Sequence, residues 1–200
     1  MKRRAEVQVA IPETRCCEDA EDDATLMTRV AASDVAAFEI IYHRYAHRVR
    51  MFLDRLIRRS LLVDEAFNDT MFVVWRRAHT YDATAKLATW IFAIAYRKGL
   101  QCVRRAKAAF DFGQAANDGV YVLEPDGVLQ QLELQQQVNR ALSALSMDQR
   151  TVLHLVYYQG CGCREIADIM QCPIDTVKTR AFYARRKLKD CLGGVRNDAP

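Results

Sequence analysis

Residues 162–188 read GCREIADIMQCPIDTVKTRAFYARRKL, and the spacing of their apolar side chains predicts two short helices joined by a tight turn. In the first helix, Ile166, Ala167 and Met170 share one face. The small side chain of Ala167 lets a second helix cross close by. Pro173 cannot continue the first helix but suits the first turn of the next one. The segment therefore has the pattern of a helix-turn-helix.

The second of these helices has a basic outer face. Val177, Ala181 and Leu188 can turn inward. The side chains left on or near the outside are those of Lys178, Thr179, Phe182, Arg185 and Arg186. Such a face suits the major groove of duplex DNA. From this segment alone, a two-helix core fragment with a solvated basic face is an equally good interpretation.

Length and composition indicate an all-α protein. The 200 residues allow one domain or two small ones, and half of them are hydrophobic. Gly and Pro are few, the apolar spacing is helical nearly everywhere, and no segment alternates convincingly like a strand. No apolar run approaches the length of a membrane span, and no apolar signal core follows the basic start Met1-Lys2-Arg3-Arg4. We therefore expect a soluble, cytoplasmic protein without membrane insertion.

Charge is spread unevenly along the chain, although the net charge is only +4. Residues 25–108 carry 15 basic and 7 acidic side chains, and residues 141–200 carry 9 and 6. Between them, residues 109–140 carry 1 basic and 5 acidic side chains. Two basic blocks on either side of an acidic connector predict two modules that each meet a polyanion.

The cysteines and histidines do not form a recognisable metal or disulfide pattern. Seven cysteines is an odd number, and no signal peptide accompanies them. Cys161, Cys163 and Cys172 fit no common zinc spacing, and they fall within or beside the helix-turn-helix. His43 and His47 are four residues apart, but no Glu completes a zinc-protease motif. We expect no metal and no cofactor.

In the first basic block, three helices are predicted before about residue 80. A short helix starts at Thr25, and Ser33 or Asp34 is a suitable cap for a long one that ends near Arg58-Arg59. Its inner residues are Phe38, Ile41, Tyr45, Val49, Phe52 and Leu56. A third helix, at about 61–79, is apolar around more of its circumference than one core contact needs. This predicts either a partner surface or a central helix buried on several sides.

A fourth helix, at about 86–107, combines aromatic and basic side chains. Its inner stripe is predicted to contain Leu87, Trp90, Ile91, Ile94, Ala95 and Val103. The side chains left outside are those of Phe92, Tyr96, Arg97, Lys98, Arg104, Arg105 and Lys107. Aromatic rings beside cations suit single-stranded nucleic acid, because bases stack on the rings and phosphates meet the cations. The alternative is that the aromatics are core and the cations a solvated face.

Turn residues divide the chain into two modules. Residues 108–127 break the helical pattern with Asn-Asp-Gly and Glu-Pro-Asp-Gly sequences, which are typical of a linker. We expect a first domain at 25–107 and a second at 128–191, with tails at 1–24 and 192–200. In the second domain, Ser146 is predicted to cap a helix that Gly160 ends.

Taken in order, these blocks resemble the extracytoplasmic-function type of RNA polymerase sigma factor, in the sigma-70 family. The resemblance covers roughly residues 25–107 and 128–191. It is carried by the segments 37–45 (AFEIIYHRY), 69–78 (DTMFVVWRRA), 89–95 (TWIFAIA), 144–146 (ALS) and 165–180 (EIADIMQCPIDTVKTR). It implies an all-α chain of two small helical domains, the sigma region 2 bundle and the region 4 helix-turn-helix, joined by a flexible linker.

The resemblance also implies roles for particular residues in transcription initiation. Binding of the clamp helices of the large polymerase subunit is implied for Glu65, Asn68, Asp69, Phe72 and Arg76. Recognition and opening of the −10 promoter element is implied for Tyr81, Lys86, Trp90, Arg97, Lys98, Arg104 and Arg105. Reading of the −35 element is implied for Arg164, Thr176, Lys178, Thr179, Phe182, Tyr183 and Arg186. The implied partners are the core polymerase, promoter DNA and an anti-sigma protein.

Three positions depart from the family pattern. The segment Glu65-Ala66-Phe67-Asn68-Asp69 replaces the usual Asp-Leu-Val-Gln-Glu but keeps its charge and polarity. Arg97 stands where an Asn is common, which changes the expected −10 base preference. Gln171 stands in the helix-turn-helix turn, where Asp, Asn or Gly is frequent. If its backbone is left-handed, Gln costs about 1 kcal/mol relative to Gly.

Two other functions remain alternatives at this point. A stand-alone helix-turn-helix regulator would bind operator DNA without polymerase, but the first domain has no ligand-site signature. A cysteine-based redox or metal sensor would hold metal when purified. No catalytic constellation converges in the sequence, so we expect no enzymatic activity.

Overall fold

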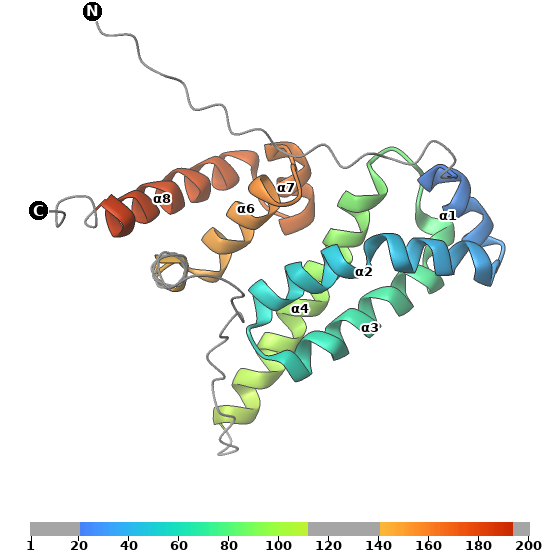
Figure 1. The fold of residues 1–200 in the computed structure, drawn as a ribbon, viewed down its shortest axis with the longest axis horizontal. Helices are drawn as coiled ribbons and strands as arrows, with labels where there is room; N and C mark the ends of the chain where they lie inside the picture. Colours follow the sequence, from blue (N-terminus) through green and yellow to red (C-terminus); the bar gives the residue numbers. More distant parts are fainter. Residues whose placement is uncertain (1–20, 112–140, 194–200) are drawn as a thin grey trace, which may run out of the picture.

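The computed structural model describes residues 21–111 and 141–193, and within these ranges the chain contains helices and no strand. Figure 1 shows two groups of helices: α1 to α4 form a bundle, and α6 to α8 pack against it. This arrangement confirms the predicted all-α class with two helical modules. None of the described helices is both long and apolar enough to cross a membrane.

The first module follows the predicted order of helices. Its elements are α1 (Asp23–Ala31), α2 (Val35–Ile57), α3 (Ser60–Arg76), a short 3-10 helix η1 (Ala78–Thr80) and α4 (Leu87–Asp111). Helix α3 ends slightly earlier than predicted, and η1 takes the residues that follow it. Helix α4 continues beyond the predicted end at Lys107, because residues 106–109 are Ala-Lys-Ala-Ala, which are good helix formers.

Of the two predicted caps, Ser33 and Asp34, it is Asp34 that caps α2. Its Oδ1 atom accepts hydrogen bonds from the backbone N–H groups of Ala36 (2.9 Å) and Ala37 (3.2 Å). Arg29 of α1 pairs with the same carboxylate at 2.7 Å. These contacts hold the pKa of the Asp34 carboxyl below its usual range, with the Arg29 hydrogen bond as the largest cause. The turn between α1 and α2 is thereby held by one side chain.

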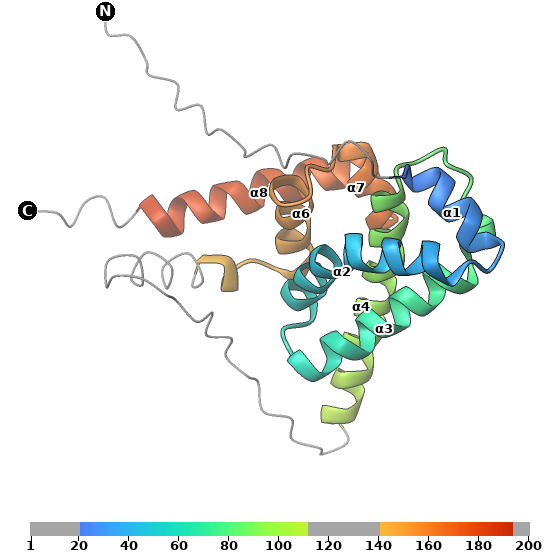
Figure 2. The same cartoon turned by 45° about the vertical axis from the view of Figure 1, so that its right-hand side comes forward.

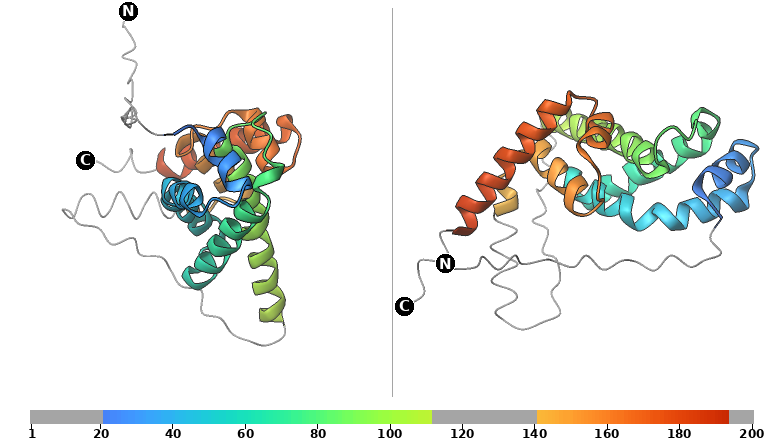
Figure 3. Two further views of the ribbon diagram at one scale, coloured as in Figure 1. Left: turned by 90° about the vertical axis from the view of Figure 1, so that its right-hand side faces the viewer. Right: turned by 90° about the horizontal axis from the view of Figure 1, so that it is seen from above.

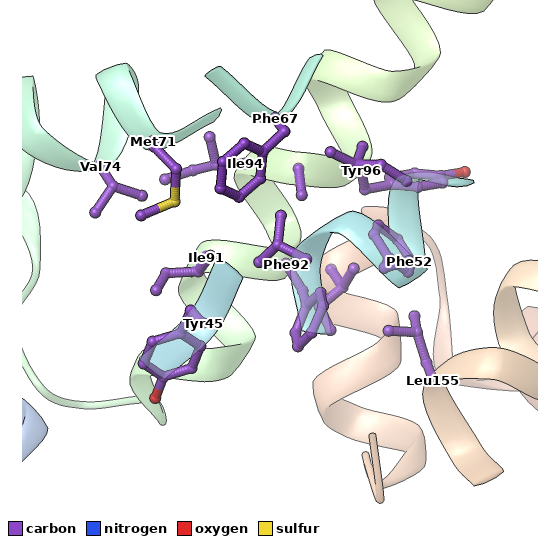
Figure 4. Packing of buried hydrophobic residues seen from close by; sticks show 14 of the residues in the cluster. Tyr45, Phe52, Phe67, Met71, Val74, Ile91, Phe92, Ile94, Tyr96 and Leu155 are labelled. Atoms are coloured by element: carbon purple, nitrogen blue, oxygen red, sulfur yellow. The ribbon is translucent and has the colours of Figure 1, made fainter. Parts of the chain in front are cut away.

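The core of the first module lies between α2, α3 and α4, which contact one another. The predicted inner residues of α2 are buried, apart from Phe38, which is half-buried, and α3 also buries residues at helical spacing. From α2 these are Ile41, Tyr45, Val49, Phe52 and Leu56, and from α3 they are Val63, Phe67, Thr70, Met71 and Val74. Figure 4 shows Phe67, Met71 and Val74 directed toward the residues of α4.

Helices α2 and α4 lie close together at Gly99, in the middle of α4. A β-carbon at this position would overlap the Leu56 side chain and lie 3.2 Å from Leu53 Cδ2. The Leu56 side chain would have to shift to admit even a β-carbon here. Gly99 therefore allows the backbone of α4 to lie against the α2 leucines.

The second module contains α6 (Met147–Tyr157), α7 (Cys163–Met170) and α8 (Ile174–Gly193). The predicted cap of α6 is present, because Ser146 Oγ accepts from Gln149 N at 3.3 Å and Gln149 Oε1 accepts from Ser146 N at 3.1 Å. Gly160 follows α6 with a left-handed backbone, φ 64°. The predicted helix before α6 and the predicted linker fall mostly outside the described residues.

The two modules share one apolar cluster. Helix α4 packs against α7, and α2 packs against α6. Figure 4 shows Leu155 of α6 beside Phe52 of α2 and near Phe92 of α4. Seen from above, α6 to α8 lie at the end of the bundle opposite α1 (Figure 3). The C-terminal part of α8 extends away from the bundle (Figures 1 and 2).

Candidate nucleic-acid interface

The helix-turn-helix is formed by α7 and α8 and has the predicted inner face. Ile166, Ala167 and Met170 are buried, as are Val177 and Ala181 of α8. The turn between the helices passes through Gln171, whose φ of 52° and ψ of 51° are left-handed. Two hydrogen bonds hold this turn: Cys172 N donates to Ala167 O at 3.1 Å, and Gln171 Nε2 donates to Asp168 O at 2.6 Å.

The residues implied for the −35 element are mostly exposed on this motif. Only Thr176 is half-buried; the exposed ones are Arg164, Lys178, Thr179, Phe182, Tyr183 and Arg186. The rings of Phe182 and Tyr183 meet edge to face with centroids 5.5 Å apart. Lys178 Nζ lies 3.1 Å from Asp175 Oδ1 within the same helix. The outer face of α8 therefore presents cations, hydroxyls and two aromatic rings.

Arg180 belongs to the same helix but faces the interior of its own module. Its guanidinium lies 2.5 Å from the Asp148 carboxylate of α6 and 3.7 Å from Cys172 Sγ. This basic side chain therefore ties α8 to α6. It is not part of the exposed basic face.

The residues implied for the −10 element are brought to α4 and its preceding loop, but their environments differ. Tyr81 and Trp90 are half-buried and pack on each other with ring centroids 5.7 Å apart. The Tyr81 hydroxyl donates to Ala85 O at 2.9 Å, which closes the loop. Burial raises the pKa of Tyr81, and the carboxylates of α1 add to this effect. The loop is thus held in shape by an aromatic pair.

The cations of α4 are partly engaged within the protein. Arg97 and Arg104 are exposed, whereas Lys98 Nζ lies 3.1 Å from Asp69 and Arg105 lies 2.7 Å from Glu65. These two ion pairs link α4 to α3. The polymerase-facing and promoter-facing sets predicted from sequence therefore share contacts along one side of the bundle.

Two aromatic side chains predicted on the outer face of α4 are buried, so this prediction is wrong. Phe92 packs edge to face on Phe52 with centroids 5.3 Å apart, and its exposure is 0%. Tyr96 is buried too, and its pKa rises to about 12, chiefly by burial and then by the nearby Asp148 carboxylate. Asp148 belongs to α6. Helix α2 covers Phe92 and the second module covers Tyr96, which periodicity in one helix could not indicate.

The residues implied for polymerase binding form one exposed strip on α3. Glu65, Asn68, Phe72 and Arg76 are exposed, and Asp69 is half-buried. The Arg76 guanidinium lies 5.6 Å from the centre of the Phe72 ring. Phe72 is 58% exposed, although phenylalanine is usually buried.

The same strip includes Leu61, which was not among the predicted site residues. Its side chain is 87% exposed, one turn before Glu65 on the same face of α3. The spacing Leu61, Glu65, Asn68, Phe72 was the available signal. An exposed leucine and phenylalanine on one face leave apolar area that a partner can cover.

Polar contacts join the loop before α4 to the helix-turn-helix. Glu165 Oε1 of α7 lies 3.1 Å from Lys86 Nζ and accepts a hydrogen bond from Thr89 Oγ1 at 3.5 Å. These contacts border a cleft of about 590 Å³ between the modules, lined by residues including Arg48, Tyr81 and Cys161. Lys86, one of the implied −10 residues, is therefore engaged by the second module.

Within the described ranges, no group of three or more His, Cys, Asp or Glu side chains could hold a metal ion. Cys161, Cys163 and Cys172 are free thiols, as are Cys102 and Cys191. Burial raises the pKa of the Cys161 thiol to about 11.

Comparison with known proteins identifies both modules. Residues 41–109 match sigma-70 region 2, and residues 135–188 match sigma-70, region 4. The ECF RNA polymerase sigma factor SigK of Mycobacterium sp. (strain KMS) is 31% identical over 173 residues, which cover 84% of this chain and 89% of that protein. The RNA polymerase sigma-H factor of Pseudomonas aeruginosa is 24% identical over 189 residues, 90% of this chain and 98% of its own length.

Solved structures share the fold. CnrH, in complex with the cytosolic domain of CnrY, superposes with a TM-score of 0.64 at 22% identity and covers 88% of this chain and 99% of that chain. RpoE from Bartonella quintana, in complex with the anti-sigma factor NepR, gives 0.64 at 23% identity, with 78% and 96% covered. With the two region matches and the relative at 31% identity, the chain belongs to the extracytoplasmic-function RNA polymerase sigma factors of the sigma-70 family.

Proposed function

We propose that the two modules of this sigma factor have different roles in transcription initiation. The first module (25–107) binds the clamp helices of core polymerase and opens the −10 element. The second module (128–191) reads the −35 element, and residues 108–127 connect the two. The protein acts in the cytoplasm without catalysing a reaction itself. An anti-sigma protein controls it, as the complexes of CnrH and RpoE with their partners suggest.

The observation that carries this proposal is the exposed strip on α3. Phe72 and Leu61 offer apolar area, while Glu65, Asn68 and Arg76 surround it with polar groups. This is the composition of an interface centre with a polar rim. A stand-alone DNA-binding protein has no need of such a strip in addition to the basic face of α8.

Transcription in vitro with core polymerase and a library of promoter sequences tests the proposal. We expect initiation at a subset of promoters that share −35 and −10 elements, and none from core polymerase alone. Tight binding to duplex operator DNA without polymerase, together with no transcription, would instead identify a stand-alone regulator.

Phe72→Ala tests the assigned polymerase surface. The ring is exposed, so its removal should leave the fold intact and weaken core polymerase binding about tenfold or more, as expected for an aromatic residue at the centre of an interface. Ile40→Ala is the control, because Ile40 is an exposed apolar side chain on α2, outside the strip. If the two variants bound core polymerase with equal affinity, Phe72 would not be part of the interface.

A further inference from the structure

The outer face of α8 carries an acidic side chain at the end where the helix begins. Asp175 lies in the first turn of α8, and its side chain is 91% exposed. On the same face, at helical spacing from it, follow the exposed residues Lys178, Thr179, Phe182 and Arg186. The face implied for the −35 element therefore begins with a carboxylate that was not among the predicted site residues.

This carboxylate lies where a helix-turn-helix meets the bases. The recognition helix of such a motif places its N-terminal residues against base edges in the major groove. Asp175 lies at that end of α8, about three turns before Arg186. A carboxylate here repels the phosphates of any duplex, so it lowers affinity unless it meets a hydrogen-bond donor. In the major groove, the donors that bases offer are the amino groups of cytosine N4 and adenine N6.

Lys178 lies beside this carboxylate and offsets its charge. Its Nζ atom is 3.1 Å from Asp175 Oδ1, and the Lys178 side chain is 63% exposed. An ammonium has three N–H donors, so Lys178 can donate to a DNA phosphate and to Asp175 at once. A salt bridge this exposed adds little to the stability of the helix. The contact therefore orients the Asp175 carboxylate and leaves it accessible to a base.

A carboxylate matches cytosine better than adenine. The major-groove edge of cytosine presents its N4 amino donor alone, whereas adenine presents the N7 acceptor beside its N6 amino group. An ionised carboxylate only accepts hydrogen bonds, so adenine N7 would repel its second oxygen. Guanine and thymine present only acceptors along this edge, and these repel the carboxylate as well. The Asp175 side chain therefore fits one base of the four.

We propose that Asp175 is a specificity-determining residue that reads one cytosine of the −35 element. Its carboxylate accepts a hydrogen bond from the cytosine N4 amino group, while Lys178 contacts a neighbouring phosphate. The carboxylate acts largely by exclusion, because the acceptors of the other bases repel it. This inference deepens the −35 role proposed above for the second module and rests on it.

Binding of the full chain, in complex with core polymerase, to a promoter library tests the proposal. The library has a fixed −10 element and a randomised −35 element, and sequencing of bound and unbound DNA gives the base preference at each position. We expect the parent to prefer cytosine over guanine or thymine at one position by about tenfold or more. Asp175→Ala should reduce that preference to about twofold or less and leave the other positions as they were.

Asp175→Asn separates base reading from a purely structural role. An Asn amide can accept from adenine N6 and donate to adenine N7, so the preference at the same position should change from cytosine to adenine. A residue that only stabilises the start of α8 could not produce this exchange. Asp190→Ala is the matched control, because it removes another exposed carboxylate of α8, 15 residues further along. It should leave the preference at every position unchanged.

The proposal is overturned if Asp175→Ala keeps the cytosine preference, if Asp175→Asn gains no preference for adenine, or if the parent prefers other bases throughout the −35 element. A parent complex with no base preference anywhere in the −35 element would instead contradict the function proposed for the second module. The parent profile and the variant profiles therefore distinguish the two failures.

Discussion

Gln171 has a left-handed backbone in the turn between α7 and α8, where glycine would be free of strain. We expect Gln171→Gly to raise the free energy of unfolding by about 1 kcal/mol. Gln171→Ala is the control, because it removes the hydrogen bond to Asp168 O but keeps the β-carbon. Urea denaturation followed by circular dichroism measures both variants. Equal stabilisation by Ala would show that the left-handed backbone is not the cause.

His154 is the residue whose titration should dominate the mild-acid stability of the protein. Burial, and then the charge of Arg55, lower its pKa from 6.5 to about 3. Above pH 6.5 both folded and unfolded chains hold a neutral imidazole, so this residue gives no pH dependence there. Below pH 6.5 the His154 imidazole is protonated in the unfolded chain but stays neutral in the folded chain. The free energy of unfolding should therefore fall with decreasing pH, by at most about 1.4 kcal/mol per pH unit.

Denaturation midpoints between pH 5 and 7 measure this effect. In His154→Leu the loss of stability between pH 6.5 and 5 should be much smaller than in the parent. His47→Gln, at an exposed histidine of α2, should keep the slope of the parent. A parental slope in His154→Leu would assign the acid sensitivity to other groups.

At the scale of the helix, the basic face of α8 predicts that DNA binding weakens as the salt concentration rises. Each phosphate contact contributes about 0.9 to the slope of log affinity against log salt concentration. Lys178→Ala or Arg186→Ala should weaken −35 DNA binding by the polymerase complex and lower that slope by about 1. Lys187→Ala is the control, because its ammonium bonds to Ala144 O of its own module. An unchanged slope in the first two variants would exclude phosphate contact.

Most of the helices could be predicted because the spacing of their apolar residues shows which face of each helix is buried. The stripe of α2 and the caps Asp34 and Ser146 depend on contacts within a few residues, which local sequence records. Leu61 was missed as a surface residue because an apolar side chain at a helix start is expected to pack. Its helical spacing with Glu65, Asn68 and Phe72 was the one sign in the sequence that it lies on the same exposed face.

At the scale of the whole molecule, the two modules hide residues that a single helix would present. Phe92 and Tyr96 lie outside the stripe that packs on α3, so periodicity placed them on the surface. Phe92 is buried against Phe52 of α2, and Tyr96 is covered by the second module, where Asp148 of α6 lies nearby. Both covering elements are distant in sequence from α4. The neutralisation of Lys86 by Glu165 was unpredictable for the same reason, since 78 residues separate them.

Cys161 offers a chemical probe of the cleft between the modules. It lines the cleft, and its pKa of about 11 results chiefly from burial, with Arg48 and Lys86 of the first module close enough to oppose the shift. We expect Cys161 in the free chain to react with iodoacetamide at pH 8 roughly tenfold or more slowly than the exposed Cys163, because only thiolate reacts. Equal rates of the two thiols in the free chain would show that the cleft does not protect Cys161.

The contact at Gly99 has a mechanical consequence. Helix α4 is about 37 Å long at 1.5 Å per residue, and it is pressed against the α2 leucines near its middle. One end leads from the loop that carries Lys86, and the other continues toward the connector between the modules. The half of α4 before Gly99 is itself buried, with Leu87, Ile91 and Tyr96 packed inside the protein and α2, α3 and α7 in contact with the helix. A pull at Asp111 therefore acts on a helix that is clamped along that half, and it does not swing the end beside Lys86.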